Sequence, residues 1–364
     1  MQLEAEIPFF ATQLGTAYLG DSLKLLPKIP SASVDLICTS PPFALLRKKA
    51  YGNVHADDYV EWFLQFAHEF ARILKPKGSL VIDIGGTWVK GFPTRSLYHY
   101  ELVIRLCDTV EKGGGGFYLA QELYWYNPAK LPTPAEWVTV RRERVKDAVN
   151  TVWWLSLDPH PKANNRRVLK GYSEAQIKLM EQGYKSKKRP SEHDISDKFG
   201  QNNNGAIPPN LINGLSESNH TMGEAVLLPV NVISASNTSS NDQYLRFCRE
   251  SNLDPHPARF PRALPEFVVG LCTEEGDVVL DPFAGSNMTG YVAETLNRRW
   301  IAFEQNEDYL KGANYRFSTN GSPTQVSNEP ALHELPTNGQ GKQDSLFELP
   351  PYIKHVIREE PIEY

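Results

Sequence analysis

Short apolar runs alternate with longer amphipathic stretches along most of the chain. Apolar runs bounded by turn residues are typical of buried strands, and apolar residues at every third or fourth position are typical of helices that cover a sheet. Strands are expected within residues 16–19, 34–38, 79–84, 117–125, 276–281 and 300–303. Helices are expected at residues 58–74, 98–110, 265–272 and 288–296. This alternation predicts an α/β fold with a doubly wound, Rossmann-like sheet.

Polar residues with candidate chemistry follow several of these strands. Asp21, Ser40 and Glu304 come just after an apolar run, and Asp281 ends another. Because ligands of open α/β sheets bind at the carboxyl ends of the strands, we expect these four side chains to border one site.

The loop Thr39-Ser40-Pro41-Pro42-Phe43 follows one of the buried strands. Its two prolines fix the backbone and carry no N–H group, so the carbonyl groups of Ser40 and Pro41 are held as acceptors beside the ring of Phe43. Such a loop suits a flat ring that carries an amino group. It also suits an ordinary structural turn, and the loop alone does not separate these two interpretations.

A second motif, Asp281-Pro282-Phe283-Ala284-Gly285-Ser286-Asn287, links an apolar strand to the helix expected at residues 288–296. Its small residues let a ligand approach the backbone, and the helix N-terminus presents unpaired N–H groups to polar ligand atoms. Glu304 follows about twenty residues later, where a carboxylate can accept hydrogen bonds from ribose hydroxyls. The pattern predicts a nucleotide site. A dinucleotide enzyme has a similar layout, but its Gly-x-Gly-x-x-Gly turn is not present here.

Both motifs resemble those of the β group of amino-methylating DNA methyltransferases, in which the catalytic loop precedes the cofactor loop. The serine form of the catalytic loop is typical of members that methylate cytosine N4. Further stretches that carry the resemblance are residues 40–45, 144–154, 190–195 and 207–211. The resemblance extends from about residue 14 to residue 318.

The resemblance implies S-adenosyl-L-methionine (AdoMet) as the methyl donor. It implies catalytic roles for four residues of the first loop, namely Ser40, Pro41, Pro42 and Phe43. Ser40 Oγ and the Pro41 carbonyl are expected to accept the amino hydrogens, while Phe43 stacks on the base. The implied cofactor residues are Asp21 at the adenine, Glu304 at the ribose, and Asp281, Phe283, Gly285 and Ser286 in the second loop.

Some of these positions keep a second interpretation. Asp21 also suits a helix N-cap, a role that does not exclude ligand contact. Asn287 stands where many members of the family carry glycine, although asparagine tolerates positive φ better than most residues. The segment from His256 to Pro261 resembles the part that closes over the methionine end of AdoMet. His256 is more simply a turn histidine, and Arg259 suits a carboxylate or a phosphate.

The predicted organisation has four parts: residues 1–155 and 251–318 as the catalytic and AdoMet-binding halves of one domain, residues 156–250 as a target-recognition region, and residues 319–364 as a polar, acidic tail. The net charge of −5 is unusual for a DNA-binding protein, but residues 130–200 hold fifteen basic and nine acidic residues. The expected DNA contacts are Arg47, Lys48, Lys49, Lys185, Lys187, Lys188 and Arg189. A solvated surface role remains open for each of them.

Composition is consistent with a cytoplasmic enzyme. An apolar content of 41% suits one large α/β domain with a smaller one, and no signal peptide or transmembrane run is expected. The four cysteines lack Cys-x-x-Cys spacing, so we expect buried thiols and no metal site. None of them follows proline, which argues against the covalent ring attack of cytosine-C5 methyltransferases.

The sequence therefore predicts a site-specific, cytosine-N4 methyltransferase acting on double-stranded DNA, with no membrane association and a monomeric state. The resemblance implies a paired restriction endonuclease and a short palindromic site such as CAGCTG, although residues 218–243 depart from the family pattern. Adenine-N6 methylation, an inactive DNA-binding regulator with the same fold, and an RNA methyltransferase remain alternatives.

Overall fold

A computed structural model describes residues 2–44, 54–127, 130–183, 201–212, 243–259 and 261–318. Residues Met1–Val326 form one compact unit, and the second unit, Ser327–Tyr364, lies outside the described residues. The predicted tail at residues 319–364 and the stretch at residues 218–242 are therefore not described.

One mixed sheet organises the first unit, in the order β1-β2-β9-β8-β3-β4-β6-β5-β7. Its strands are β1 (Phe10–Ala11), β2 (Gly15–Leu19), β3 (Val34–Thr39), β4 (Leu74–Ile84), β5 (Tyr118–Tyr126), β6 (Val149–Ser156), β7 (Leu211–Ile212), β8 (Val278–Asp281) and β9 (Arg299–Glu304). Strands β2, β9, β8, β3 and β4 run parallel, whereas β6 is antiparallel to both β4 and β5. The carboxyl ends of the parallel strands consequently meet at one edge of the sheet.

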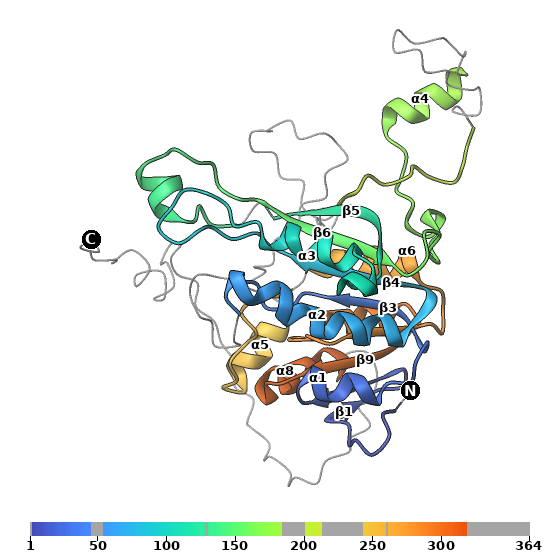
Figure 1. Cartoon of the computed structure of the whole chain (residues 1–364). Coiled ribbons are helices and arrows are strands. Elements are labelled where there is room, and N and C mark those ends of the chain that lie inside the picture. The colour runs from blue at the N-terminus through green and yellow to red at the C-terminus, as the bar shows by residue number, and fades with distance from the viewer. Residues whose placement is uncertain are drawn as a thin grey trace, which may run out of the picture. The chain divides into compact units, whose positions relative to one another are not determined.

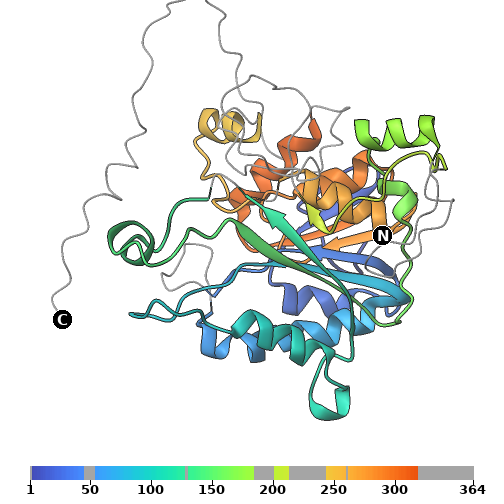
Figure 2. The same ribbon diagram turned by 90° about the horizontal axis from the view of Figure 1, so that it is seen from above.

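Helices cover both faces of this sheet, as Figures 1 and 2 show. The first face carries α1 (Ser22–Leu25), η1 (Leu26–Lys28), α2 (Ala56–Ile73) and α3 (Tyr98–Cys107). The second face carries α6 (Ala263–Cys272), α7 (Met288–Thr295) and α8 (Glu307–Ser318). The remaining helical segments are η2 (Val110–Lys112), η3 (Glu136–Val140), η4 (Asn165–Val168), α4 (Glu174–Gln182) and α5 (Gln243–Glu250).

Each face of the sheet has its own apolar core. Successive residues of a strand point to opposite faces, and β3 accordingly sends Ile37 into the core under α2 and Leu36 into the core under α6. Burial on both faces explains why the parallel strands are continuous apolar runs in the sequence. The predicted α/β, doubly wound architecture is confirmed.

The two-residue strands β1 and β7 were not expected, and two longer strands also differ from the sequence-based expectation. The predicted strand at residues 79–84 begins earlier, at Leu74, directly after α2, and its Pro76 lies in the exposed part of the strand. Strand β6 was not expected, because its asparagine and threonine interrupt the apolar run Val149–Ser156. It matters for the site, since β6 places Asn150 beside the end of β4.

All four cysteines are free thiols, of which Cys107 is half-buried and the others are buried. Within the described ranges, no helix has both the length and the apolar character needed to cross a membrane.

Candidate active site

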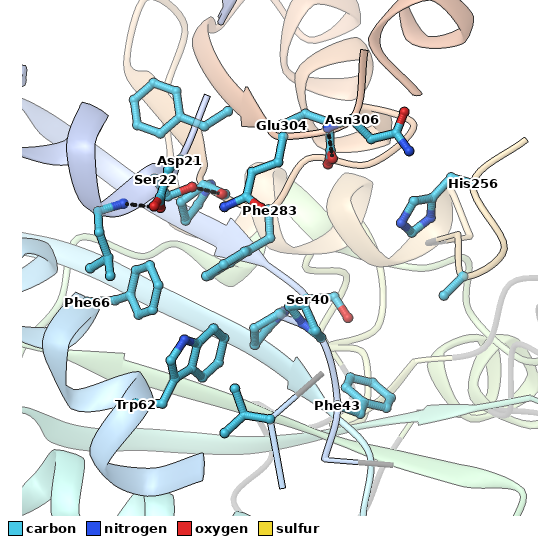
Figure 3. Close-up of a pocket in the computed structure, with 18 of the residues that line it drawn as sticks. Asp21, Ser22, Ser40, Phe43, Trp62, Phe66, His256, Phe283, Glu304 and Asn306 are labelled. Atoms are coloured by element: carbon cyan, nitrogen blue, oxygen red, sulfur yellow. Dashed lines mark hydrogen bonds between the residues drawn. The ribbon is translucent and has the colours of Figure 1, made fainter. Parts of the chain in front are cut away.

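A cavity of about 850 Å³ opens at the carboxyl ends of β2, β3 and β9. Figure 3 shows its labelled residues, with Ser40 between Phe283 and Phe43 and with Asp21 and Glu304 on the opposite wall. Seven of the predicted catalytic or cofactor residues line the cavity: Asp21, Ser40, Pro41, Pro42, Phe43, Phe283 and Glu304. Its volume lies in the range of about 300–1,000 Å³ that is usual for small-molecule sites.

The acidic wall is held by backbone hydrogen bonds. Glu304 accepts the N–H group of Gly285 at 2.8 Å and that of Asn306 at 2.9 Å. Burial raises the pKa of Glu304, while these backbone hydrogen bonds oppose the shift. Because an ionised carboxylate accepts about four hydrogen bonds, the side chain keeps capacity for ribose hydroxyls.

Gly285 itself does not line the cavity but is required behind Glu304. Its φ is +51°, and a Cβ at this position would lie 3.0 Å from His256 Nε2. His256 does line the cavity, and its ring packs edge-on against Tyr309 with centroids 4.7 Å apart. Burial lowers the pKa of His256 to about 4, so its imidazole is neutral at pH 7.

Asp281 lies beneath the cavity wall rather than on it. The carboxylate is 2% exposed and accepts the hydroxyls of Thr39 and Thr289, each at 2.7 Å, and the N–H group of Phe283 at 3.1 Å. Burial raises the pKa of Asp281 to about 6, against these hydrogen bonds. Its direct contact with the cofactor stays a prediction; its visible role is to tie β3 to the 281–287 loop.

Ser286 is a buried residue of this loop, and its carbonyl accepts a hydrogen bond from Arg316 Nε at 2.9 Å. Asn287 adopts the left-handed conformation, with φ of 49°, and its side chain accepts the N–H group of Gly290 as the N-cap of α7. Asn287 therefore adopts the positive φ that the sequence analysis expected asparagine to tolerate at this position.

Asp21 has the helix N-cap role that the sequence offered, whereas its contact with the cofactor stays a prediction. Its carboxylate caps α1 by accepting the N–H group of Leu23 at 3.0 Å, and the side chain also lines the cavity. The next residue, Ser22, donates its hydroxyl to the carbonyl of Pro282, which joins the first turn of α1 to the 281–287 loop.

The catalytic loop contacts a buried carboxyl group that the sequence did not single out. Ser40 Oγ donates to Asp83 Oδ2 at 3.2 Å. This contact follows from sheet register, because Thr39 of β3 pairs with Ile82 of β4 and so brings the next residue of each strand together. Asp83 is 2% exposed, and its Oδ1 makes no hydrogen bond within the described part of the chain.

Burial raises the pKa of Asp83 to about 7. The neighbouring Asn150 and Ser40 and the positive charge of Lys130 oppose this shift, although Asn150 does not complete a hydrogen bond to Oδ1. Lys130 Nζ instead donates to Asn150 Oδ1 at 2.8 Å. A carboxyl group with these properties exchanges a proton readily near neutral pH, which is what a proton acceptor requires.

Phe43 is held against the end of β4. A Cβ added to Gly85 would lie 2.7 Å from the Phe43 ring, so only glycine lets the ring pack here. The Gly85 carbonyl accepts the buried hydroxyl of Tyr98, which anchors the same backbone from α3. Phe43 also lines the cavity, so its ring has an open side toward a ligand.

Two aromatic residues of α2 complete the wall and were not expected as site residues. Trp62 and Phe66 line the cavity and pack against Phe283, with ring centroids 6.0 Å and 5.1 Å away. Both lie at the border of the apolar stripe of α2, where the sequence pattern resembles that of ordinary core residues.

The predicted DNA contacts lie outside the described residues. These are Arg47, Lys48, Lys49, Lys185, Lys187, Lys188 and Arg189.

Comparisons with known proteins point to one family. Residues 34–315 match the family described as DNA methylase. A curated relative, the type II methyltransferase M.PvuII of Proteus hauseri, is 46% identical over 316 residues, which are 86% of this chain and 86% of the relative. The type II methyltransferase M.BglII of Bacillus subtilis is 27% identical over 88% of this chain and 73% of its own length.

A solved structure gives the same result for the fold. The structure named PvuII DNA methyltransferase (cytosine-N4-specific) matches with a TM-score of 0.65 and 41% identity, and the match covers 88% of this chain and 92% of that one.

Proposed function

Because this chain belongs to the DNA methylase family, we propose that it transfers a methyl group from AdoMet to the exocyclic N4 of cytosine in double-stranded DNA. The observation that carries the proposal is the contact of Ser40 with buried Asp83 in a Ser-Pro-Pro-Phe loop that lines the cavity. The similarity to a relative named as cytosine-N4-specific supports the choice of base.

The acidic and aromatic part of the cavity fits AdoMet. Asp21 and Glu304 are carboxylates on its wall, suited to an adenine amino group and to ribose hydroxyls, and Phe283 offers an aromatic face. When bound, AdoMet supplies an electrophilic methyl group on a sulfonium centre. The residues that would hold it are Asp21, Phe283 and Glu304 at the wall, while Asp281, Gly285 and Ser286 fix the shape of the 281–287 loop that carries Phe283.

The catalytic loop would hold the target base, which must leave the helix stack to reach it. Ser40 Oγ and the Pro41 carbonyl accept the two amino hydrogens, and Phe43 stacks on the ring. Hydrogen bonds in these directions draw the N4 lone pair out of conjugation and toward the methyl group. Their contribution is orientation and electrostatic stabilisation.

Asp83 provides the destination of the proton. As N4 gains the methyl group it becomes positively charged, and it regains neutrality by losing one hydrogen as a proton. Ser40 accepts that proton at Oγ while its own hydroxyl proton passes to Asp83 Oδ2 along the existing hydrogen bond. The products are neutral N4-methylcytosine, S-adenosyl-L-homocysteine, whose sulfur would keep the electron pair of the broken S–C bond, and protonated Asp83. The Asp83 pKa of about 7 suits both uptake and later release of the proton.

Recognition of a specific site is assigned to residues 156–250, which overlap the basic surplus counted at residues 130–200. In a type II system the methylated site is protected from a paired restriction endonuclease, and we propose this pairing here. CAGCTG is the site to test first. A monomer suits an enzyme that modifies one strand at each encounter.

Product analysis tests the proposed function. Purified protein is incubated with AdoMet and, in separate reactions, with plasmid DNA containing CAGCTG or with RNA, and the nucleic acid is digested to nucleosides for mass spectrometry. N4-methylcytosine is the expected product. N6-methyladenine would contradict the choice of base, and methylation of RNA alone would contradict the choice of nucleic acid.

A further inference from the structure

A short hairpin with an exposed aromatic tip follows β4 immediately. Trp88 and Arg95 form an antiparallel bridge, the Val89 N–H group donates to the Thr94 carbonyl at 2.9 Å, and the Ser96 N–H group donates to the Thr87 carbonyl at 3.0 Å. We call residues 87–96 the 87–96 hairpin. Its tip holds Phe92, whose exposed fraction is 61%. An aromatic side chain is thus displayed to solvent by an ordered turn.

The hairpin is braced by a second, basic segment. Arg144 Nε donates to the Pro93 carbonyl at 3.1 Å, and Arg95 forms an ion pair with Asp147 while its guanidinium lies 4.9 Å from the Trp88 ring centroid. We call residues 139–146 the basic segment. Figures 1 and 2 show both stretches leaving the same end of the sheet, the hairpin in cyan-teal and the basic segment in green.

The base of the hairpin is part of the catalytic wall. The hairpin begins two residues after Gly85, against which Phe43 packs, and four residues after Asp83. Arg95 also lies close enough to Lys130 and His99 to lower the pKa of each, secondary to the effect of burial. The tip and the flipped-base pocket are therefore carried by one continuous piece of structure.

The exposed surface of these two stretches is cationic around an apolar tip. The basic segment contains four basic residues and one acidic residue, although the whole chain carries a net charge of −5. Lys90 beside the tip, Arg142 and Arg144 are exposed, and within the described residues none of the three is paired with a carboxylate. Phosphates on either side of a disrupted base step would match this arrangement.

A second copy of this chain fits the surface less well, because it would bring the same cations face to face. A duplex with one base displaced offers both complements at once. It presents negative phosphates to the cations and an unfilled place in the base stack to an apolar side chain.

Resting on the proposed function, we infer that the 87–96 hairpin and the basic segment contact duplex DNA beside the target, with Phe92 inserted where the cytosine leaves the stack. Lys90, Arg142 and Arg144 hold the flanking phosphates. Phe92 favours the flipped state by occupying the vacated space, and it takes no part in methyl transfer itself.

The test compares two synthetic duplexes that carry the target sequence, which is first located by mapping the methylated positions in plasmid DNA. In one the target cytosine is paired with guanine, and in the other it faces an abasic position, so that leaving the helix requires no base-pair opening. Phe92→Ala should slow single-turnover methylation of the paired duplex roughly tenfold or more, because unpairing and unstacking cost a few kcal/mol. On the abasic duplex the variant should stay within about twofold of the wild type.

Matched controls separate this effect from general loss of surface contacts. Ile104 of α3 has the same exposed fraction of 61%, and Ile104→Ala should change neither rate. Lys90→Ala with Arg142→Ala should weaken DNA binding and reduce the slope of log affinity against log salt by about one for each lost phosphate contact. Lys112→Ala, an exposed cation of η2, should leave that slope unchanged.

Equal slowing of both duplexes by Phe92→Ala, or no slowing of either, would overturn the wedge role. A Phe92→Ala variant that differs from the wild type in sedimentation would instead assign the tip to contacts between copies. Failure of the wild type to methylate either duplex would contradict the proposed function itself, and an unchanged salt slope in the double variant would then overturn the DNA-contact surface separately.

Discussion

The two sides of the cavity treat their buried carboxyl groups differently. On the cofactor side, Asp281 and Glu304 each accept hydrogen bonds on both oxygens from side chains or backbone N–H groups. On the catalytic side, Asp83 accepts a hydrogen bond from Ser40 Oγ at 3.2 Å, and its second oxygen accepts none within the described residues. A satisfied carboxylate fixes a loop, whereas an unsatisfied one is costly to bury and is poised to change its protonation.

This difference predicts which property each side controls. Variants on the cofactor side should change AdoMet affinity or stability. Variants on the catalytic side should change the rate of methyl transfer and its dependence on pH, with AdoMet affinity preserved.

The largest effect is expected from Ser40→Ala. This change removes the acceptor for one amino hydrogen and the link to Asp83, so turnover should fall by roughly 10²-fold to 10⁴-fold. AdoMet affinity, measured by calorimetry on the same protein, should stay within about threefold of the wild type. Turnover that is unchanged would remove Ser40 from the mechanism.

A smaller, opposite pattern is expected from Asp281→Ala. Thr39, Thr289 and the Phe283 N–H group would lose their acceptor, so the 281–287 loop should loosen and AdoMet affinity should fall by roughly tenfold or more. Equilibrium binding measures this directly, and Thr289→Val, which removes a single hydrogen bond to the carboxylate, is the matched milder variant. Wild-type affinity in Asp281→Ala would contradict the assignment.

Gly85→Ala sharpens the comparison from the catalytic side. The new methyl group would lie 2.7 Å from the Phe43 ring and must displace it, so turnover should fall about tenfold while AdoMet binds normally. Single-turnover rates and cofactor titration on one preparation separate the two quantities. A variant that loses AdoMet affinity as much as turnover would show that the two sides are not independent.

The smallest effect concerns stability. The pKa of Asp83 is raised in the folded protein from 3.8 to about 7, so its stabilising contribution is complete below the unfolded pKa and is lost as pH rises through about 7. Relative to Asp83→Asn, the wild type should therefore lose unfolding free energy between pH 5 and pH 8, by about 2 kcal/mol or more. Denaturant titrations of both proteins at each pH measure the difference, and parallel curves would contradict the buried, proton-binding state.

Much of the fold could be predicted because parallel strands buried on both faces leave continuous apolar runs. The run before Ser40 and the run ending at Asp281 are of this kind, and the loops that follow them carry recognisable chemistry. Strand β6 escaped prediction because an antiparallel strand with polar residues lacks that signal.

Asp83 escaped for a different reason. Its contact with Ser40 depends on the register of β3 against β4, which joins residues far apart in the chain and is not encoded in either segment alone. A lone acidic residue within the apolar run of β4 was the available signal. Trp62 and Phe66 had no comparable signal, because a cavity wall and a core face of α2 have the same pattern.

The pH dependence of single-turnover methylation, compared between the wild type and Asp83→Asn, tests the central claim most directly. If Asp83 must be ionised to receive the proton, the wild-type rate should rise with pH, reach half its maximum near pH 7 and level off above it, because burial holds the pKa of Asp83 at about 7. Asp83→Asn should be slower by roughly 10²-fold and lack this rise, with AdoMet affinity preserved. An Asp83→Asn variant with the wild-type rate and the same rise with pH would contradict the account.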